Sequence, residues 1–410
     1  MYYLGLDFGT SGARACVIDE QQTALWQRAI FWPAGDSDAP MQPANWRQAL
    51  LELITQIPIS LRSKLGALAI DATSGTVLLV DEQGAPVSPV LPYNHPLAHD
   101  PAAKLTWLRQ HDTRQRAHRL MHQIDYLNRQ LLGHHAASDW HNALKSGFDP
   151  QTLSWRPHAS ADIGLLPPVV APGSIIGHIS SAISQQTGLP VDCQVCAGTT
   201  DSIAAFLAAS PLTPGSAVTS LGSTLVIKLL STTPVWSFEH GIYSHRLDRS
   251  GKLWLTGGAS NSGGAVLSHY FDVATLERLS ADIQPDRPSG LDYYPLLQPG
   301  ERFPVHDPHL APRIDPRPDN HSLWLHGMLE GIARIEQQGY MQLVSLGATP
   351  PTQIMTTGGG SRNPAWQAIR QRLLNLPVQR AAHDEAAYGS ALLAHQHGRN
   401  AVRNKAQISA

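Results

Sequence analysis

The feature that most constrains this chain is a strand–turn–strand pattern that occurs twice. In residues 4–18, the turn 9–12 places glycine, threonine and serine between two apolar segments, and residues 217–229 repeat this layout around the turn 222–224. Glycine lets the backbone curl closely, so such a turn can direct several N–H groups and hydroxyls at one anion. Two such hairpins predict a duplicated α/β protein that holds a polyphosphate from both sides. Only the first hairpin carries a carboxylate, Asp7, which favours catalysis over simple binding.

Composition narrows the class of protein. A chain of 410 residues is too long for one ordinary core and predicts two domains of roughly 200 residues each. A hydrophobic content of 42% with 15% charged residues is typical of a globular chain and not of a disordered one. The formal net charge of −2 supplies no basic field for a nucleic-acid backbone, so no nucleic-acid partner is expected.

The sequence also predicts the compartment. Residues 1–4 lead directly into a strand, so no signal peptide is expected, and no apolar run reaches the roughly 18 residues of a membrane span. Cys193 and Cys196 form a lone CxxC on an apolar strand, which favours buried thiols over a metal or redox site. We therefore expect a cytoplasmic protein with no membrane partner. The sequence leaves its oligomeric state open, because no heptad pattern declares an interface.

Strands and helices are expected to alternate along the chain. Apolar segments that run into glycine-rich or hydroxyl-rich turns are expected to be strands: 65–71, 194–197, 253–255 and 354–357. Segments with apolar residues at helical spacing are expected to be helices: about 45–56, 113–132, one after Asp201 and one with Asn363 as its N-cap. This alternation predicts two mixed sheets flanked by helices, with a cleft between them and a linker at 211–215.

Four segments of this chain carry a resemblance to a known family. Residues 6–11, 198–202, 220–224 and 357–363 occur in the same order in the FGGY carbohydrate kinases, and the likeness runs from residue 1 to about 394. That family has the two-domain α/β fold of actin and hexokinase, the ribonuclease H-like fold, with a central nucleotide cleft. The resemblance therefore implies an enzyme that uses ATP and Mg²⁺ to phosphorylate a small-molecule sugar.

The resemblance also implies the division of labour along the chain. Because residues 385–391 resemble the family's closing helix, the N-terminal sugar-binding and catalytic domain is expected to comprise 1–208 with 385–410. The C-terminal nucleotide-binding domain is expected to comprise 209–384. The short chain, with its segments 73–76 and 138–143, most resembles the compact cyanobacterial and plant xylulokinase-like enzymes that act on D-ribulose. This implies D-ribulose as the sugar and D-ribulose 5-phosphate as the product, with D-xylulose and other sugars or polyols left open.

Two departures from the family concern the sugar pocket. Many members have Gln-Met-His-Gly where this chain has residues 73–76. Many also have an aromatic-Asn/Asp-Arg motif where this chain has residues 93–95, which lack the arginine. A sugar pocket of different construction is therefore expected.

Two carboxylates are the candidate catalytic groups. Asp201 follows a Gly-Thr-Thr turn, and by the resemblance it is expected to be the general base that deprotonates the attacking hydroxyl. The other interpretation is a cap on the helix that follows, and the two roles are compatible. Asp7 ends the first strand and is expected to hold Mg²⁺ through water beside the phosphates. Its other interpretation is a turn aspartate bonded to its own loop.

The remaining candidates divide by the ligand they are expected to contact. The phosphate-binding candidates are Thr10, Ser11, Gly12, Gly222, Ser223 and Thr224. The candidates for the rest of the nucleotide are Gly258, Gly358, Gly359, Asn363 and Trp366. The sugar-binding candidates are Asp7, Ser11, Gly12, Arg14, Ser74, Asn94, Asp139 and Asp201.

Several of these candidates also have a purely structural interpretation. Arg14 can reach a product phosphate or form a surface ion pair, and Gly258 can approach the nucleotide or serve a strand-to-helix turn. Trp366 can stack on adenine or lie in the core, because its helical spacing points inward. The three short polar sugar candidates can equally be turn formers or helix caps.

Other functional classes are tested by their motifs. A dehydrogenase requires GxGxxG at the opening of a helix, and a P-loop NTPase requires GxxxxGK[ST]; neither pattern is present. An actin-like or chaperone-type ATPase, in which nucleotide drives a conformational switch without a sugar substrate, remains the rival class. The turn that carries Asp201 favours the kinase.

Overall fold

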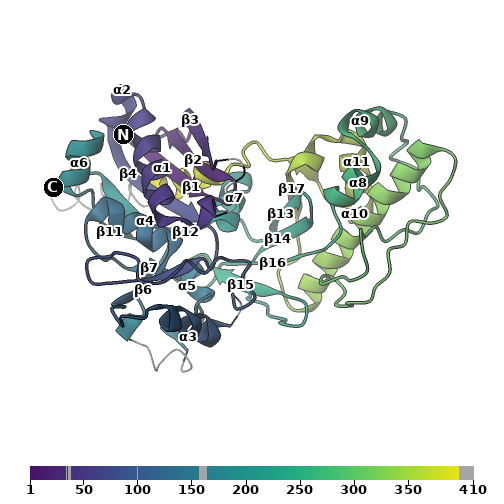
Figure 1. Cartoon of the computed structure of the whole chain (residues 1–410). Helices are drawn as coiled ribbons and strands as arrows, with labels where there is room; N and C mark the ends of the chain where they lie inside the picture. The colour runs from purple at the N-terminus through teal and green to yellow at the C-terminus, as the bar shows by residue number, and fades with distance from the viewer. Residues whose placement is uncertain (34, 36–37, 99, 157–163, 397–410) are drawn as a thin grey trace. The chain divides into compact units, whose positions relative to one another are not determined.

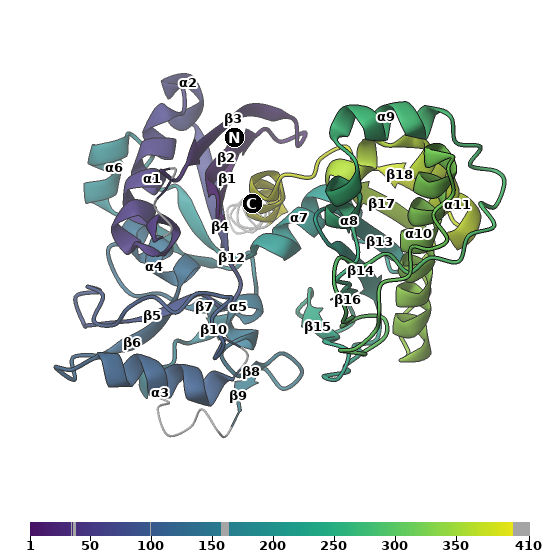
Figure 2. The same ribbon diagram turned by 45° about the vertical axis from the view of Figure 1, so that its right-hand side comes forward.

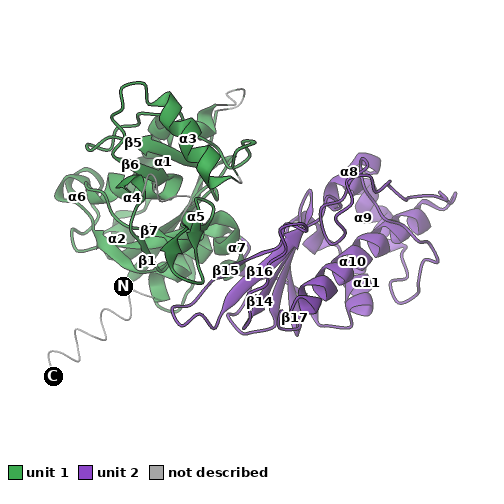
Figure 3. Ribbon diagram, turned by 90° about the horizontal axis from the view of Figure 1, so that it is seen from below, with its two compact units in different colours: residues 1–208, 385–410 green, residues 209–384 purple. Residues whose placement is uncertain are grey.

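The chain forms two compact units. The computed structural model describes residues 1–396 apart from 34, 36–37, 99 and 157–163. Unit 1 contains residues 1–208 with the C-terminal segment from residue 385, and unit 2 contains residues 209–384 (Figure 3). Each unit is built on a six-stranded sheet and is described by itself.

The sheet of unit 1 has the strand order β11-β12-β4-β1-β2-β3. In chain order, its strands are β1 (Tyr2–Phe8), β2 (Gly12–Ile18), β3 (Ala24–Phe31), β4 (Leu65–Ala72), β11 (Ile175–His178) and β12 (Gln194–Thr200). Strand β1 is antiparallel to β2 and parallel to β4, and β12 is parallel to β4. The mixed sheet that the sequence predicts is therefore confirmed.

Two helical layers cover this sheet, because successive side chains of a strand point to opposite faces. Leu4 and Leu6 of β1 belong to the core shared with α1 (Pro43–Gln56) and α4 (Gln123–Leu132). Tyr3 belongs to the cluster shared with the C-terminal helix, residues 386–396. Figure 2 shows α1, α4 and α6 (Ser181–Thr187) on one side of the sheet, and α7 (Asp201–Ala209) with the C-terminal helix on the other.

The C-terminal helix lies directly on β1. A Cβ atom added to Gly5 would lie 1.9 Å from the backbone oxygen of Ala387, so a larger residue at position 5 would push the helix away. The last helix of the chain is thus part of the N-terminal sheet's packing.

Smaller elements complete unit 1. They are η1 (Ala39–Met41), α2 (Ile59–Arg62), β5 (Val77–Val80), α3 (Pro101–His111), β6 (Arg119–His122), β7 (Ser138–Asp139), α5 (Trp140–Leu144), β8 (Phe148–Asp149), β9 (Ser154–Trp155) and β10 (Val169–Val170).

Two predicted helices of unit 1 can be compared with the structure. The helix expected at 45–56 is confirmed by α1. The helix expected over 113–132 is wrong in its first part, because Leu120 lies in β6, which pairs with β5. Helix α4 begins only at Gln123, where His122 and Asp125 form a capping box.

The sheet of unit 2 has the strand order β15-β16-β14-β13-β17-β18. Its strands are β13 (Ser216–Leu221), β14 (Leu225–Ser231), β15 (Tyr243–Arg246), β16 (Trp254–Ala259), β17 (Gln353–Thr357) and β18 (Val378–Arg380). Its helices are α8 (Gly264–Tyr270), α9 (Val273–Ala281), α10 (His321–Ser345), η3 (Gly359–Arg362) and α11 (Pro364–Leu374). Strand β13 is antiparallel to β14 and parallel to β17, so this sheet is also mixed. Figure 1 shows α10 running the length of the unit beside α11.

Two further observations concern the cysteine thiols and the apolar character of the helices. All three cysteines are buried and free, and burial raises the pKa of Cys196 to about 12, as befits an inert thiol. None of the helices in the described part of the chain is long and apolar enough to cross a membrane. Helix α10 has 25 residues but carries buried Glu330 and Glu336.

Two buried carboxylates anchor α10 to its neighbours. Arg370 of α11 donates two hydrogen bonds to Glu336, from Nε at 2.6 Å and Nη2 at 2.8 Å, and Nη1 donates to Thr356 Oγ1 of β17 at 2.7 Å. Glu330 accepts hydrogen bonds from Arg372 and from both the backbone N–H and hydroxyl of Ser289. Because each carboxylate is paired and hydrogen-bonded, its burial is compensated.

The network around Glu330 makes the stability of unit 2 depend on pH. Burial opposes ionisation of Glu330, but hydrogen bonds from His326, Ser289 and Arg372 outweigh it and hold the pKa at about 2, below the ordinary value for glutamate. A carboxyl group whose pKa is depressed by folding stabilises the folded state above its unfolded pKa, and this contribution is lost as pH falls toward the folded pKa.

We expect Glu330→Gln to lower the midpoint of thermal unfolding at neutral pH, because the charged donors lose their partner. The gap between wild type and variant should be constant above about pH 5 and shrink between about pH 4.5 and pH 3. Differential scanning calorimetry across this range measures the gap, with the exposed Glu277→Gln as control. A gap that stays constant or widens down to pH 3 would contradict the assignment.

Candidate active site

The candidate site of unit 1 lies where three parallel strands end. Strands β1, β4 and β12 run in the same direction, so their carboxyl ends meet at one edge of the sheet. Asp7 of β1 lies opposite Asp71 of β4, and Asp71 lies opposite Thr199 of β12. Asp201 follows β12 directly. The register therefore gathers three carboxylates that are far apart in the sequence.

Two hydrogen bonds from Trp32 hold the first hairpin turn in place. The ring N–H of Trp32 donates to the carbonyl of Gly9 at 3.0 Å, and its backbone N–H donates to the carbonyl of Ser11 at 3.1 Å. Thr10 and Ser11 themselves are exposed. With the carbonyls held by Trp32, the hydroxyls at the tip of the turn remain on the surface of unit 1, as an anion-binding turn requires.

Arg14 joins this turn to the acidic edge. Its Nη1 donates to Asp7 Oδ2 at 3.1 Å, its Nη2 donates to Ser11 Oγ at 3.1 Å, and its Nε lies 3.7 Å from Glu385 Oε2. The ion-pair interpretation of Arg14 is therefore confirmed. The same geometry places its positive charge beside the hydroxyl-bearing turn.

Asp71 is a member of this site that the sequence analysis missed. Its side chain is fully buried and accepts a hydrogen bond from Ser390 Oγ of the C-terminal helix at 2.7 Å. Burial, and then the negative charge of Asp7, raise the pKa of Asp71 well above its ordinary range. No cation pairs with Asp71 among the described residues, whereas Asp7 has Arg14. Burial also raises the pKa of Asp7, but there Arg14 opposes the effect. Asp71, which has no such cation, therefore binds a proton more readily than Asp7 does.

A signal for Asp71 exists in the sequence. Residues 65–71 are an apolar strand that ends in an aspartate just before a hydroxyl-rich turn, as residues 4–7 do. The pairing of the two strands in matching register was the missing information.

Asp201 begins helix α7 and is partly exposed. Its Oδ1 accepts a hydrogen bond from the backbone N–H of the next residue, Ser202, at 2.6 Å, whereas a capping side chain accepts from the second or third residue of the helix. The negative charge of Asp201 is the smallest of the effects that raise the pKa of buried Asp71. The cap interpretation and the catalytic interpretation of Asp201 both stay predictions.

The chemistry of this edge suits a magnesium ion held mainly by phosphate and water. Within the described ranges no group of three or more His, Cys, Asp or Glu side chains is arranged to hold a metal. Mg²⁺ in phosphoryl-transfer sites typically keeps several waters and uses one or two carboxylates. Asp7 is 5% exposed and accepts a hydrogen bond from Arg14, and its contact with the metal through water stays a prediction.

The structure gives different surroundings to the three short polar candidates for sugar binding, Ser74, Asn94 and Asp139. Ser74 follows β4, and its hydroxyl is buried with no hydrogen-bond partner among the described residues. Asn94 lies exposed in a turn after β5. Asp139 is only 1% exposed and caps α5, accepting hydrogen bonds from the backbone N–H groups of His141 and Asn142 and from the Asn142 side chain.

Burial raises the pKa of Asp139 to about 6. Its carboxylate is already committed to the helix start, so the sugar-binding interpretation of Asp139 is replaced by the cap.

In unit 2, the second hairpin turn is supported in a similar way. The carbonyls of Gly222 and Ser223 accept hydrogen bonds from the backbone N–H groups of Gly264 and Ala265, at 2.8 and 3.0 Å. Ser223 is exposed and Gly222 and Thr224 are partly exposed. As at the first turn, the carbonyls are satisfied within the unit while the hydroxyl side stays accessible.

The glycine loop after β17 combines one open position with a capped helix. A Cβ at Gly359 would meet nothing within 4 Å, so the backbone there is open to close approach by a ligand. Gly358 has φ +78°, a left-handed conformation that favours glycine. Asn363 is confirmed as the N-cap of α11: it accepts from the backbone N–H of Trp366 at 3.0 Å and donates to Ser280 Oγ at 2.8 Å.

Two nucleotide candidates are corrected by their packing. Trp366 is 1% exposed and its ring N–H donates to the carbonyl of Leu329, so the indole is a core residue and does not offer a face for adenine. A Cβ at Gly258 would lie 2.6 Å from the ring of Phe303, which accounts for the glycine by close packing. Trp366 thus follows its structural interpretation, whereas Gly258 lies within β16 and not in the strand-to-helix turn that the sequence suggested.

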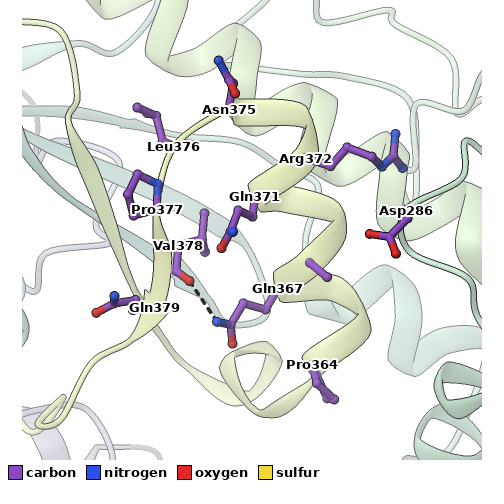
Figure 4. A pocket seen from close by; sticks show the side chains of 11 residues that line it. Asp286, Pro364, Gln367, Gln371, Arg372, Asn375, Leu376, Pro377, Val378 and Gln379 are labelled. Atoms are coloured by element: carbon purple, nitrogen blue, oxygen red, sulfur yellow. Dashed lines mark hydrogen bonds between the residues drawn. The ribbon is translucent and has the colours of Figure 1, made fainter.

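A separate polar hollow of about 790 Å³ lies against α11 and β18 (Figure 4). Gln367 donates to the carbonyl of Val378 at 2.9 Å, Gln371 lies on the same side of α11, and Arg372 extends toward Asp286. Its lining includes none of the glycines nominated for the nucleotide. The hollow is therefore distinct from the glycine loop.

Two sheets of this topology, hydroxyl-rich hairpins in both units and an aspartate after the third parallel strand define a sugar kinase fold. Two family models match: the N-terminal domain of the FGGY family of carbohydrate kinases over residues 96–208 and its C-terminal domain over residues 217–396. The chain therefore belongs to the FGGY family and is an ATP-dependent carbohydrate kinase.

The relatives act on different sugars. A gluconokinase of Bacillus subtilis is 22% identical, with 92% of this chain and 83% of the relative covered. A xylulose kinase of Staphylococcus epidermidis is 22% identical over 95% of this chain and 87% of the relative. The crystal structure of a xyloylose kinase from Brucella ovis superimposes with a TM-score of 0.84 and 22% identity, covering 98% of this chain and 91% of that one.

The Asp71 contact predicts a contrast between two variants of similar size. In Asp71→Asn the amide oxygen can still accept from Ser390, so kcat should stay within a fewfold of wild type. Asp71→Leu removes this bond and the polar group beside Asp7, and it should lower kcat by about 10- to 100-fold, as loss of an orienting partner typically does. Steady-state kinetics with thermal unfolding as a fold check measure this. Equal loss in both variants, or full activity of the leucine variant, would refute the role.

Proposed function

We propose that this protein transfers the γ-phosphoryl group of ATP to a hydroxyl of a ketopentose, D-ribulose, with Asp201 as general base. Family membership supplies the reaction class. The observation that carries the proposal is the placement of Asp201, Asp7 and the hydroxyl turn 10–11 at one edge of the unit 1 sheet. A base and a phosphate-holding turn at one edge are what phosphoryl transfer to an alcohol requires.

In the proposed reaction, the sugar oxygen attacks the γ-phosphorus while its proton passes to the Asp201 carboxylate. The bond between the γ-phosphorus and the oxygen that bridges it to the β-phosphate breaks, and ADP leaves. The exposed hydroxyls of Thr10 and Ser11 donate to the transferred group, and Arg14 adds positive charge beside them. When bound, Mg²⁺ neutralises phosphate charge; Asp7 is the residue proposed to hold it through water.

The sugar is proposed as D-ribulose on the resemblance of residues 73–76 and 138–143 to the compact xylulokinase-like enzymes. The unpartnered hydroxyl of Ser74 supports a polyol ligand at the end of β4, because a buried hydroxyl without a partner is costly. D-Xylulose is the second candidate, favoured by the relatives from Staphylococcus epidermidis and Brucella ovis that are named as kinases of that sugar. Gluconate is favoured by the Bacillus subtilis relative.

A panel of sugars decides between these substrates. With D-ribulose, D-xylulose, gluconate and glycerol in turn, steady-state ADP release should rise above the sugar-free rate, most strongly with D-ribulose. A larger response to D-xylulose or gluconate would correct the substrate and leave the kinase in place. Robust ATP hydrolysis that no sugar accelerates would favour the nucleotide-switch class instead.

Asp201→Asn should lower sugar phosphorylation by about 10²- to 10⁴-fold, the usual contribution of a general base. The fold should persist, since asparagine also supports helix starts, and nucleotide affinity should change little. Coupled ADP detection and isothermal titration with ADP measure the two effects. The exposed Asp192→Asn provides the matched control. Near-normal turnover of Asp201→Asn would remove Asp201 as the base.

A further inference from the structure

Lys104 of α3 is a buried lysine that none of the roles above uses. Its side chain is 1% exposed, and within the described part of the chain no carboxylate lies at ion-pair distance from it. Burial, and then the charge of Lys145, lower its pKa to about 8. An ammonium group buried without a counter-ion opposes folding unless it is hydrogen-bonded. Its hydrogen-bond partners therefore show what holds it there.

Both partners are backbone carbonyls, and they belong to different loops. Lys104 Nζ donates to the carbonyl of Lys145 at 2.9 Å and lies 3.4 Å from the carbonyl of Gly75, which it also contacts as a donor. Residues 75 and 145 are 70 positions apart in the chain, so the lysine bridges two segments that sequence does not connect. Because both acceptors are neutral carbonyls, hydrogen bonds and not an ion pair hold the bridge together.

The first carbonyl belongs to the loop that carries Ser74. Both ends of residues 73–76 are already fixed: Thr73 Oγ1 donates to Gln123 Oε1 at 2.7 Å and lies 2.7 Å from Thr76 Oγ1. Gly75, in the middle, has φ +86° and is contacted by Lys104. The lysine thus holds the apex of the loop whose ends the threonines hold.

The second carbonyl, that of Lys145, belongs to a helix that contacts the strand preceding Asp201. Lys145 is the C-cap of α5, the helix that Asp139 caps at its start. Near the start of α5, His141 Nδ1 lies 2.7 Å from Thr199 Oγ1, which is near the end of β12 and two residues before Asp201. Lys104 is therefore one contact from the Ser74 loop and, through α5, two contacts from the strand that presents Asp201.

We propose that Lys104 is a positioning residue that clamps the Ser74 loop to helix α5 and so sets the place of the sugar relative to Asp201. The inference rests on the proposed function of the Asp201 edge. If Lys104 served only general stability, its replacement would lower the unfolding temperature without a selective effect on the Michaelis constant for the sugar. A clamp also sets the mobility of residues 73–76 and the Michaelis constant for the sugar.

The first test measures the clamp without substrate. Lys104→Met keeps the aliphatic length and removes the donors, and Lys104→Gln keeps an amide donor without charge. Hydrogen–deuterium exchange of peptides that span residues 73–76 and 141–147 should be about tenfold faster in Lys104→Met, with an intermediate effect in Lys104→Gln. The exposed Lys64→Met is the matched control and should exchange like wild type.

The second test measures kinetics with the sugar to which the wild type responds. Lys104→Met should raise KM for the sugar about tenfold or more with a smaller change in kcat, while KM for ATP stays within twofold. Lys104→Gln should recover part of the loss. Unchanged exchange together with unchanged sugar KM would overturn the proposal, as would loss of the fold in both variants, because the role would then be global. A wild type inactive on every sugar would overturn the proposed function alone, since the exchange experiment still judges the clamp.

Discussion

The parallel pairing of β1, β4 and β12 is the constraint on which the candidate site depends. Parallel strands bring their carboxyl ends to one edge, and the register sets Asp7 beside Asp71 and Asp71 beside Thr199. A slip of one residue would turn each of these side chains to the other face of the sheet. The apolar alternation of β1, with Leu4 and Leu6 in one layer and Tyr3 in the other, holds the register in place.

The C-terminal segment completes this edge from the far end of the chain. Ser390 donates to Asp71, Glu385 lies beside Arg14, and the helix itself rests on β1 where Gly5 leaves room. Burial and the negative charge of Asp7 raise the pKa of Asp71, whereas Arg14 opposes the rise that burial causes at Asp7. The electrostatic surroundings of Asp7 are in this way set by residues that no local sequence pattern connects to it.

Buried polar contacts in the two units serve a common purpose. In unit 1, Asp139 fixes the start of α5 and Lys104 holds its end to the Ser74 loop. In unit 2, the pair formed by Glu336 and Arg370 ties α10 and α11 to β17, the strand that leads into the glycine loop. Neutral or compensated hydrogen bonds of this kind are rigid, because breaking one leaves a buried group without a partner. Buried hydrogen bonds therefore hold in place the helices and strands next to the loops that are candidates for ligand binding.

The sequence by itself determined the class of fold, the two hydroxyl-rich hairpins and the nomination of Asp7 and Asp201. These features are local: glycine and hydroxyl turns, strand alternation and helix caps are all encoded within a few residues, as Asn363 and α1 illustrate. The spacing of apolar residues over 113–132 predicted a single helix, which is wrong in its first part. A short apolar run fits a strand as well as a helix, and the residues that pair with β5 form strand β6. Only the tertiary structure decided that Trp366 is core, that Asp139 is a cap, that Asp71 lies beside Asp7, and that Lys104 bridges two loops. Each of those outcomes depends on which distant segment packs against the residue, and burial and partner choice are properties of that packing alone.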